Sequence, residues 1–292
     1  MQYSLWLLSD IAATNSQFKK FLSMLTNHLT ILSDINDTVY TTPVCRLEVT
    51  SKLELMALKE AIQSLVNDAG FDCLLKPTSE ADVTPKLLIM DMDSTLVQAE
   101  TIDQIAKHAG IMSEVAAITE SAMRGELDFT QSLLKRVSML NGIAEAELTE
   151  VHDALPLTTG AETLIRGANA HDCYTVLVSG GFTYFAQPVA DRIGIREVHA
   201  NTLEFANGRL TGRVTGAIVD AEYKKNTLEQ LLVERGIKRQ ETIAIGDGAN
   251  DLLMLGAAGT GIAFHGKPKV QAESKAALNV FGLDALNWWL GW

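Results

Sequence analysis

The chain has 292 residues, 47% of them hydrophobic and 21% charged, a balance typical of a globular protein that excludes a disordered or collagen-like chain. With 24 basic and 36 acidic side chains, the net charge is −12, so neither nucleic acid nor an anionic membrane is expected as a partner. At about 150 residues per domain, the length predicts roughly two domains.

The cysteines and the N-terminus indicate the compartment. Cys45, Cys73 and Cys173 are widely spaced and form no C-x-x-C pair. This pattern argues against a disulfide framework or a zinc site and favours a reducing cytoplasm. No apolar run reaches the ~20 residues of a membrane helix. The apolar start, MQYSLWLLSD, lacks the basic residues of a secretory signal, so we interpret it as a strand of the mature protein.

Residues 1–78 are predicted to form a small α/β domain. Two amphipathic segments have apolar residues at helical spacing; Asn15 or Ser16 would cap the first, and Gly70 would end the second. The strand-like segments are 3–9, 38–42, 44–51 and 71–76, and the helical ones are 15–28 and 53–70. The order β-α-β-β-α-β is ferredoxin-like, and the polar segment 79–85 after it is predicted to be a linker.

Residues 86–292 are predicted to form a second α/β domain, with a core of 86–97 and 156–292 and a helical cap at 98–155. Unbroken apolar runs, typical of strands buried on both faces, occur at 86–90, 174–181, 242–246 and 261–264. Because they alternate with helices, such as the one predicted over 224–236, these strands are expected to pair in a doubly wound parallel sheet.

Two further features of this domain predict local structure. Asn207 and Gly208, between two alternating segments, predict a β-hairpin. Three tryptophans, Trp288, Trp289 and Trp292, lie near the end of the sequence without basic neighbours. We therefore expect them to seal the sheet or a domain interface rather than to contact a membrane.

Three of the predicted parallel strands end in polar turns. The residues at these ends are Asp91 and Asp93, then Ser179 and Gly180, then Asp247, Asn250 and Asp251. Such residues also form ordinary turns, but three turns, each directly after a buried strand, indicate a ligand site at one sheet edge. Four carboxylates there would repel one another, and Mg²⁺ is the cation that carboxylate oxygens and water suit.

The order of these residues suggests their roles. Asp91, the first residue after its strand, would attack phosphorus and form an aspartyl-phosphate. Asp93, two residues on, would protonate the leaving oxygen and then deprotonate water. The hydroxyl of Ser179 and the amide of Gly180 would bind phosphoryl oxygens.

A cation is also needed beside the phosphoryl group. Lys224 and Lys225 both open a predicted helix, where a positive charge opposes the helix dipole. At least one of them therefore has another reason to be there, and either could neutralise the phosphoryl oxygens.

These residues closely resemble the motifs of the haloacid-dehalogenase-like phosphatase superfamily. Its D-x-D-x-[T/V] loop matches residues 91–95, its second-motif serine Ser179, its third-motif lysine Lys224, and its acidic fourth motif residues 246–251. The second aspartate of the loop is typical of the phosphatases in this superfamily. The resemblance covers residues 86–265 and implies a doubly wound core, a cap and a Mg²⁺ cofactor.

The match is closer still to the phosphoserine phosphatase family. It includes DMDST followed by Glu100, MRGELDF at 123–129, Arg136, VSGGF at 178–182 and GDGAND at 246–251. The resemblance implies that Glu100 and Arg136 bind the amino-acid part of the substrate, since glutamate pairs with an ammonium group and arginine offers a fork to a carboxylate. It also implies that Met123 and Phe129 line the pocket and that Asn250 lies near the phosphate.

The same resemblance implies a ligand set for the metal. Asp91, the carbonyl oxygen of Asp93 and Asp247 would hold it, and Asp251 would hold Lys224 or a metal-bound water. Residues 1–78 resemble the amino-acid-binding, ACT-like modules that precede some of these phosphatases. A dimerisation or folding module without a ligand fits equally well, so an amino-acid effector and a homodimer both stay open.

We therefore expect Mg²⁺-dependent hydrolysis of O-phospho-L-serine, the last step of serine biosynthesis. A phosphotransferase acting on a small alcohol such as homoserine would share every motif. A phosphatase of broader specificity also stays open, because the substrate assignment depends on Glu100 and Arg136. A ligand-sensing binding protein would lack Asp91, Asp93 or Lys224, and all three are present.

Overall fold

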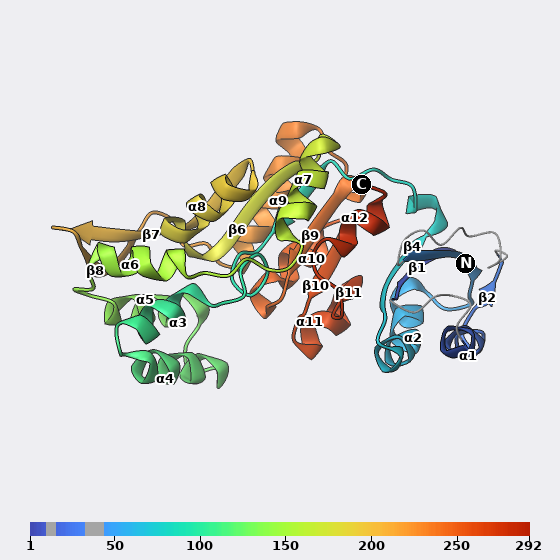
Figure 1. The fold of residues 1–292 in the computed structure, drawn as a ribbon, viewed down its shortest axis with the longest axis horizontal. Helices are drawn as coiled ribbons and strands as arrows, with labels where there is room; N and C mark the ends of the chain where they lie inside the picture. Colours follow the sequence, from blue (N-terminus) through green and yellow to red (C-terminus); the bar gives the residue numbers. More distant parts are fainter. Residues whose placement is uncertain (10–15, 33–43) are drawn as a thin grey trace.

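In the computed structural model, which describes residues 1–9, 16–32 and 44–292, eleven strands form one continuous sheet (Figure 1). Their order is β2-β3-β1-β4-β11-β10-β9-β5-β6-β7-β8. The six strands from β11 to β7 in this order run parallel to one another. The strands β1 to β4 pair antiparallel, and so do β4 with β11 and β7 with the edge strand β8. The predicted doubly wound, mostly parallel α/β sheet is thus confirmed.

The elements before residue 78 follow the order β-α-β-β-α-β. They are β1 (Gln2–Leu8), α1 (Ser16–Leu25), β2 (Thr30–Ile31), β3 (Val44–Thr50), α2 (Leu55–Ala69) and β4 (Asp72–Pro77). We call this part the N-terminal domain. The short strand β2 was not predicted. The strand predicted at 38–42 and the cap predicted at Asn15 lie outside the described residues.

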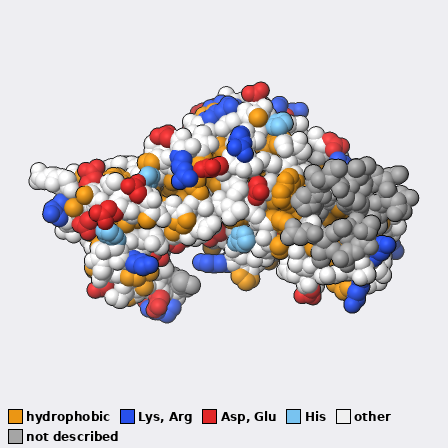
Figure 2. All heavy atoms as spheres, viewed as in Figure 1, with side chains coloured by type: hydrophobic (Ala, Val, Ile, Leu, Met, Phe, Trp, Pro, Cys, Tyr) orange, Lys and Arg blue, Asp and Glu red, His pale blue; other side chains and the backbone are white. Residues whose placement is uncertain are grey.

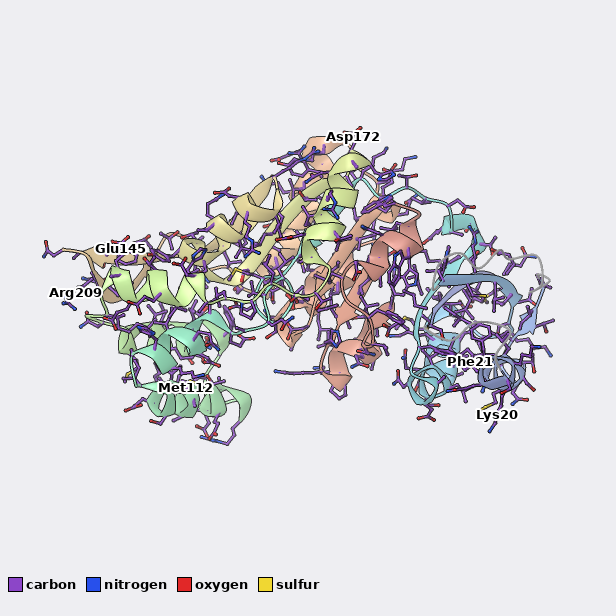
Figure 3. All side chains as sticks on the ribbon, in the orientation of Figure 1. Lys20, Phe21, Met112, Glu145, Asp172 and Arg209 are labelled. Atoms are coloured by element: carbon purple, nitrogen blue, oxygen red, sulfur yellow. The ribbon has the colours of Figure 1, made fainter. Side chains whose placement is uncertain are left out.

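Helix α1 shows why these segments fold as they do. Its apolar residues at helical spacing are buried, and Phe21 packs edge-on against Phe71 with ring centroids 4.8 Å apart. Lys20, next in sequence to Phe21, is exposed and points away from the domain (Figure 3). Helix α2 ends where predicted, because Gly70 adopts a left-handed conformation with φ of 70° that suits a residue without Cβ.

The central strands are buried on both faces by different helices. They are β5 (Leu87–Met90), β6 (Tyr174–Phe182), β9 (Thr242–Gly246), β10 (Thr260–Phe264) and β11 (Ala276–Leu278). Leu88 and Met90 face α7 (Ala161–Ala170) and α8 (Thr183–Ile193). Leu87 and Ile89 face α9 (Ala221–Arg235) and α10 (Leu252–Ala257). This alternation along one strand explains the unbroken apolar runs in the sequence.

The predicted cap is helical. It contains α3 (Thr101–His108), α4 (Met112–Met123), α5 (Phe129–Met139) and α6 (Glu145–Asp153), drawn in green in Figure 1. The hairpin formed by β7 (Glu197–Ala206) and β8 (Arg209–Thr215) turns at Asn207 and Gly208 as predicted. It supports the cap, because Gly142 and Leu210 share a backbone hydrogen bond of 2.8 Å.

The N-terminal domain joins the core at β4. Its Cys73 pairs with Ala277 of β11, and Asp72 accepts hydrogen bonds from the backbone N–H groups of residues 279–281. The ammonium group of Lys59 donates to the carbonyls of Gln271 and Ser274, around the end of α11 (Pro268–Glu273). These contacts tie α2 and β4 to the segment that follows β10.

The tryptophan-rich segment 288–292 also lies at the contact between the N-terminal domain and the core. A domain interface was one of the two positions expected for it from the sequence. Helix α12 (Ala285–Leu290) carries Trp289, which is buried in one apolar cluster with Trp6 and Leu74 of the N-terminal domain. On the face seen in Figure 2, acidic and basic side chains are interspersed over the core and the cap. None of the described helices is long and apolar enough to cross a membrane.

Candidate active site

Asp91 lies directly after β5, at the carboxyl edge of the parallel strands. Its side chain is buried, and its backbone N–H donates to the carbonyl of Ile245 on β9, so it is held as an extension of the sheet. Its Oδ1 accepts a hydrogen bond of 2.7 Å from the N–H of Met92. The position of this carboxylate is therefore fixed from both sides, as a nucleophile requires.

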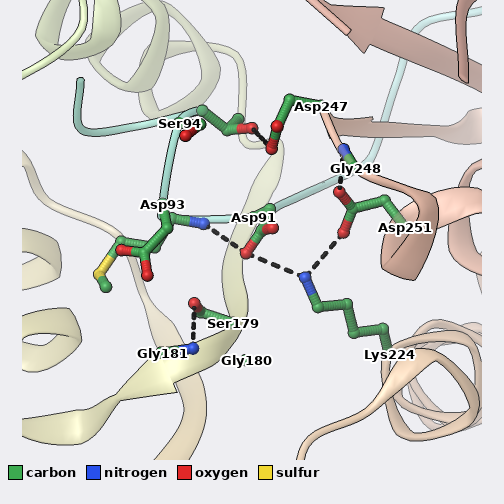
Figure 4. A network of polar contacts seen from close by, with 12 residues as sticks. Asp91, Asp93, Ser94, Ser179, Gly180, Gly181, Lys224, Asp247, Gly248 and Asp251 are labelled. Carbon is green, nitrogen blue, oxygen red and sulfur yellow. Dashed lines mark hydrogen bonds and ion pairs between the residues drawn. The ribbon is translucent and has the colours of Figure 1, made fainter. Parts of the chain in front are cut away.

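Lys224 is the lysine that reaches Asp91. It comes from the first turn of α9, which Asp220 caps through the N–H of Tyr223. Its Nζ, fully buried, lies 2.9 Å from Oδ1 of Asp91 and 2.7 Å from Oδ1 of Asp251 (Figure 4). Burial acts to lower the pKa of Lys224, but the two carboxylates outweigh it and raise that pKa above its ordinary value. Lys225 instead pairs with Glu229 on the surface of α9.

Three carboxylates converge on one point beside the nucleophile. Asp91, Asp247 and Asp251 each place an oxygen within 4.8 Å of the others. Burial, followed by the charges of Asp251 and Asp91, raises the pKa of Asp247 to about 7. Thr95 donates to Asp247 over 3.5 Å, and Gly248 N–H donates to Asp251 over 3.0 Å. Crowded carboxylates are a donor set that suits a divalent hard cation, so this cluster could hold one. Asp91 and Asp247 are two of the predicted metal ligands, whereas Asp251 was predicted to hold Lys224 or a metal-bound water.

Asp93 has the environment of a general acid. Its Oδ2 accepts a hydrogen bond of 2.9 Å from Thr101, and its Oδ1 is buried with no partner among the described residues. Burial, then the charges of Glu100 and Asp91, raises the pKa of Asp93 well above its ordinary value. A carboxyl group with a raised pKa holds a proton that it can give to a leaving oxygen.

The last part of β6, where its pairing register with β7 shifts between Val178 and Phe182, brings Ser179 and Gly180 to the same place. Ser179 is fully buried, and its hydroxyl accepts a hydrogen bond of 2.9 Å from Gly181 N–H. A Cβ at Gly180 would lie 3.1 Å from the ring of Phe129, so a side chain here would push on the cap. Asn201, which the sequence did not single out, holds this part of β6 by donating to the Gly180 carbonyl over 2.8 Å.

A cavity of about 610 Å³ opens over these groups, between the core and the cap. The predicted site residues that line it are Asp91, Asp93, Glu100, Phe129, Arg136, Ser179, Gly180, Asp247 and Asn250. Lys224 and Asp251 lie beneath, in contact with Asp91 or with each other. The side chain of Met123, at the end of α4, is outside what the structure describes.

Glu100 and Arg136 face the cavity with opposite charges. Glu100 accepts a hydrogen bond of 2.8 Å from Ser94, and burial raises its pKa. Arg136 reaches the cavity from α5. Burial lowers the pKa of Arg136 below its ordinary value, although the charges of Asp103 and Glu100 act to raise it. The pair can therefore bind the ammonium and carboxylate groups of an amino acid.

Lys267 is a lining residue that the sequence reasoning missed. It caps the start of α11, and its backbone N–H donates to the carbonyl of Asp247 over 3.3 Å. The signal was present, because Lys267 follows the strand β10, and each of the other polar turns was identified by its place after a parallel strand. With Arg136, it brings positive charge to a cavity that several carboxylates line.

Comparisons with known proteins show which family this chain resembles. A sequence profile of haloacid dehalogenase-like hydrolases matches residues 88–256. The phosphoserine phosphatase of Haemophilus influenzae is 48% identical over 71% of this chain and 68% of its own length. That of Streptomyces coelicolor is 42% identical over 85% of this chain and 61% of its own length. The chain therefore spans only about two thirds of the length of these curated relatives.

A solved structure covers nearly the whole chain. A haloacid dehalogenase family hydrolase from Salmonella enterica serovar Typhi superposes with a TM-score of 0.87 at 31% sequence identity. The superposition covers 99% of this chain and 98% of that chain, so the N-terminal elements are included in the likeness.

Proposed function

Since the chain belongs to the phosphoserine phosphatases of the haloacid dehalogenase-like hydrolase family, we propose that it hydrolyses O-phospho-L-serine to L-serine and phosphate. We further propose that the reaction uses Mg²⁺ and an aspartyl-phosphate on Asp91. One observation carries the proposal: the buried carboxylate of Asp91 lies 2.9 Å from the ammonium group of Lys224 and lines the same cavity as Glu100 and Arg136.

The first half-reaction transfers the phosphoryl group to Asp91. Because Lys224 and Met92 N–H hold Oδ1, we infer that Oδ2 attacks phosphorus. The bond from phosphorus to the serine oxygen breaks, and Asp93 gives its proton to that oxygen. The raised pKa of Asp93 supports this role, since the proton must still be present when substrate binds.

The second half-reaction hydrolyses the aspartyl-phosphate. Asp93, now a carboxylate, takes a proton from water as the water oxygen attacks phosphorus, and Asp91 leaves as a carboxylate. The cap helices limit the water that can reach this point. Mg²⁺ held by Asp91, the Asp93 carbonyl oxygen and Asp247 would offset the negative charge of the phosphoryl oxygens.

Recognition of the substrate divides between the core and the cap. Ser179, Gly180, Asn250 and Lys267 surround the phosphate, and Lys224 balances the charge of Asp91 beneath it. On the side of the cap, Glu100 pairs with the ammonium group and Arg136 with the carboxylate of phosphoserine. Phe129 supplies an apolar wall beside them, and the same role for Met123 stays a prediction from the sequence.

The wider role follows from the reaction. Hydrolysis of phosphoserine is the last step of serine biosynthesis, and we infer that the protein works in the cytoplasm, whose reducing conditions suit three buried cysteines that form no disulfide. For the N-terminal domain we keep the ACT-like assignment, with an amino-acid effector or a homodimer contact as its two candidate roles.

A panel of phosphorylated metabolites, assayed with Mg²⁺ and with chelator, tests the proposal. We expect phosphoserine to be hydrolysed with the highest kcat/KM and chelator to stop the release of phosphate. Added homoserine should yield no new phosphate ester, which separates hydrolysis from phosphotransfer. Equal kcat/KM values across the panel would instead support a phosphatase of broad specificity.

A further inference from the structure

A second cavity, of about 350 Å³, lies between the N-terminal domain and the core. It shares no lining residue with the catalytic cavity. Its walls come from β1, β3 and β4, from residues 81–85 and from residues 288–292. At this volume it falls at the small end of the roughly 300–1,000 Å³ range of small-molecule sites.

Lys76, in the wall of this cavity, is a cation without an ion-pair partner among the described residues. It lies on the same face of β4 as Leu74, which packs into the main apolar cluster beside Trp289. Only 8% of Lys76 is exposed, and none of the ion pairs among the described residues involves it. Burial lowers the pKa of Lys76 to about 8. The charge of Glu80 acts against this shift and that of Lys275 adds to it. A buried lysine side chain without an ion-pair partner is costly, and such side chains are normally paired.

The other polar groups of the wall do not supply that anion. Asp82 is already paired with Arg46, with 2.6 Å between Nη1 and Oδ1, and Arg46 also bonds to Glu48. The indole N–H of Trp289 is a second buried donor without an acceptor among the described residues. Among the described residues of this wall, none therefore forms an ion pair with Lys76.

The rest of the wall is aromatic. Trp6, Trp288, Trp289 and Trp292 all line the cavity. The guanidinium group of Arg46 lies 5.0 Å from the Trp6 ring centroid. Flat aromatic walls bury the apolar body of an organic molecule better than they surround an inorganic ion.

We propose that this interdomain cavity binds a small organic anion, whose charged group pairs with Lys76 and whose apolar part packs against the tryptophan rings. The bound anion would sit against both the N-terminal domain and α12. It would therefore stabilise the contact between the domains, because it would bind more tightly when the two domains are in contact than when they are apart.

Intrinsic fluorescence tests this proposal directly, because the four tryptophans of the chain are the four that line the cavity. The full chain is titrated with benzoate, with phenylphosphonate and with the neutral isostere benzamide. We expect a saturable change with at least one anion and an affinity for benzamide at least tenfold weaker. The preferred anion identifies the charged group, carboxylate or phosphonate. Equal affinity for the three probes, or no saturable change with either anion, overturns the proposal.

Two variants locate the charge. Lys76→Met keeps the length of the side chain and suits a buried position, and it should weaken binding of the anion at least tenfold. Lys52→Met removes an exposed lysine of the same domain that does not line the cavity, and it should leave the affinity unchanged. Unaltered binding in Lys76→Met contradicts the assignment. If Lys76→Met fails to fold, the affinities of the unmodified chain for benzoate and for benzamide still test whether the cavity prefers an anion.

Discussion

The ammonium group of Lys224 lies 2.9 Å from Oδ1 of Asp91, and both side chains are buried. The same ammonium group is 2.7 Å from Asp251, so one lysine balances two carboxylates at the floor of the catalytic cavity. This arrangement links the end of β5 to the first turn of α9. It holds the Asp91 carboxylate in place without an exposed cation beside it.

Asp91→Asn should abolish turnover and the incorporation of covalent phosphate. The amide has the size of the carboxylate but is a far poorer nucleophile, and Lys224 retains Asp251 as its partner. The measurement is acid-quenched protein after incubation with labelled phosphoserine. Asp103→Asn is the matched control, since Asp103 lines the same cavity and has no part in the transfer. An Asp91→Asn enzyme that still turns over would remove the nucleophile assignment.

Without metal, stability should fall as pH rises through the range in which Asp247 ionises. The folded-state pKa of Asp247 is raised to about 7, against about 3.9 when unfolded. The native state therefore binds more protons between these values, and the stability present at low pH is lost as pH approaches 7. Each unit of difference in pKa corresponds to about 1.4 kcal/mol at most.

Thermal unfolding with chelator checks this expectation. The Tm should decrease from pH 5 to pH 8, and Mg²⁺ should raise it more at pH 8 than at pH 5, because metal binding requires ionised carboxylates. Asp247→Asn should flatten the pH dependence and reduce the effect of Mg²⁺. A metal-free Tm that rises over this range would contradict the raised pKa.

Lys267→Gln should raise the KM for phosphoserine about five- to tenfold with a smaller change in kcat. The expected size is that of one exposed charge-assisted hydrogen bond to phosphate, on the order of 1 kcal/mol. Lys269→Gln is the control: Lys269 lies in the first turn of α11, two residues after Lys267, pairs with Glu273 and does not line the cavity. Equal KM values for the two variants would exclude a contact between Lys267 and the substrate.

The sequence predicted the elements whose pattern is local. Buried strands, the hairpin at Asn207 and Gly208 and the end of α2 at Gly70 each follow from a few adjacent residues. Strands β2 and β11 have two and three residues, too few for any periodicity, so only their pairing reveals them. The pairing of β4 with β11, which joins the two parts into one sheet, is a tertiary contact without a local signal.

The site divides in the same way. Asp91, Asp93 and Asp247 could be predicted because each follows a parallel strand, and the topology of the sheet brings the ends of these strands together. The same reasoning could not choose between Lys224 and Lys225, which share a helix start and differ only in the direction of their side chains. Nor could it find Asn201, whose role depends on its contacts with Gly180 and Val219 across the fold.

Arg136→Ala should raise the KM for phosphoserine far more than the KM for an aryl phosphate. Arg136 lines the cavity from the cap and would pair with the carboxylate, which an aryl phosphate lacks. Lost bidentate pairing predicts a difference of about tenfold or more between the two substrates. Steady-state kinetics on both substrates provide the measurement, and Arg136→Lys should recover part of the loss. Parallel losses on both substrates would assign Arg136 to the fold of the cap instead.

Asp72→Ala should loosen the contact between the N-terminal domain and the core. The carboxylate accepts three backbone N–H groups, from Asn279 at 2.7 Å, Val280 at 3.0 Å and Phe281 at 2.9 Å. Removing it takes away the acceptor of three part-buried N–H groups, which costs about 1–3 kcal/mol. The exposed Asp68, on α2 of the same domain, gives the control Asp68→Ala, which should change stability by less than about 0.5 kcal/mol.

Urea unfolding followed by two signals distinguishes loosening of this contact from general destabilisation. All four tryptophans line the cavity between the domains, so fluorescence reports that contact, whereas circular dichroism reports the helices of the whole chain. In Asp72→Ala the fluorescence transition should occur at lower urea than the dichroism transition, and in Asp68→Ala the two should coincide. Coincident transitions in both variants would mean that β4 and β11 unfold with the core as one cooperative unit, and that Asp72 stabilises the whole sheet rather than its junction.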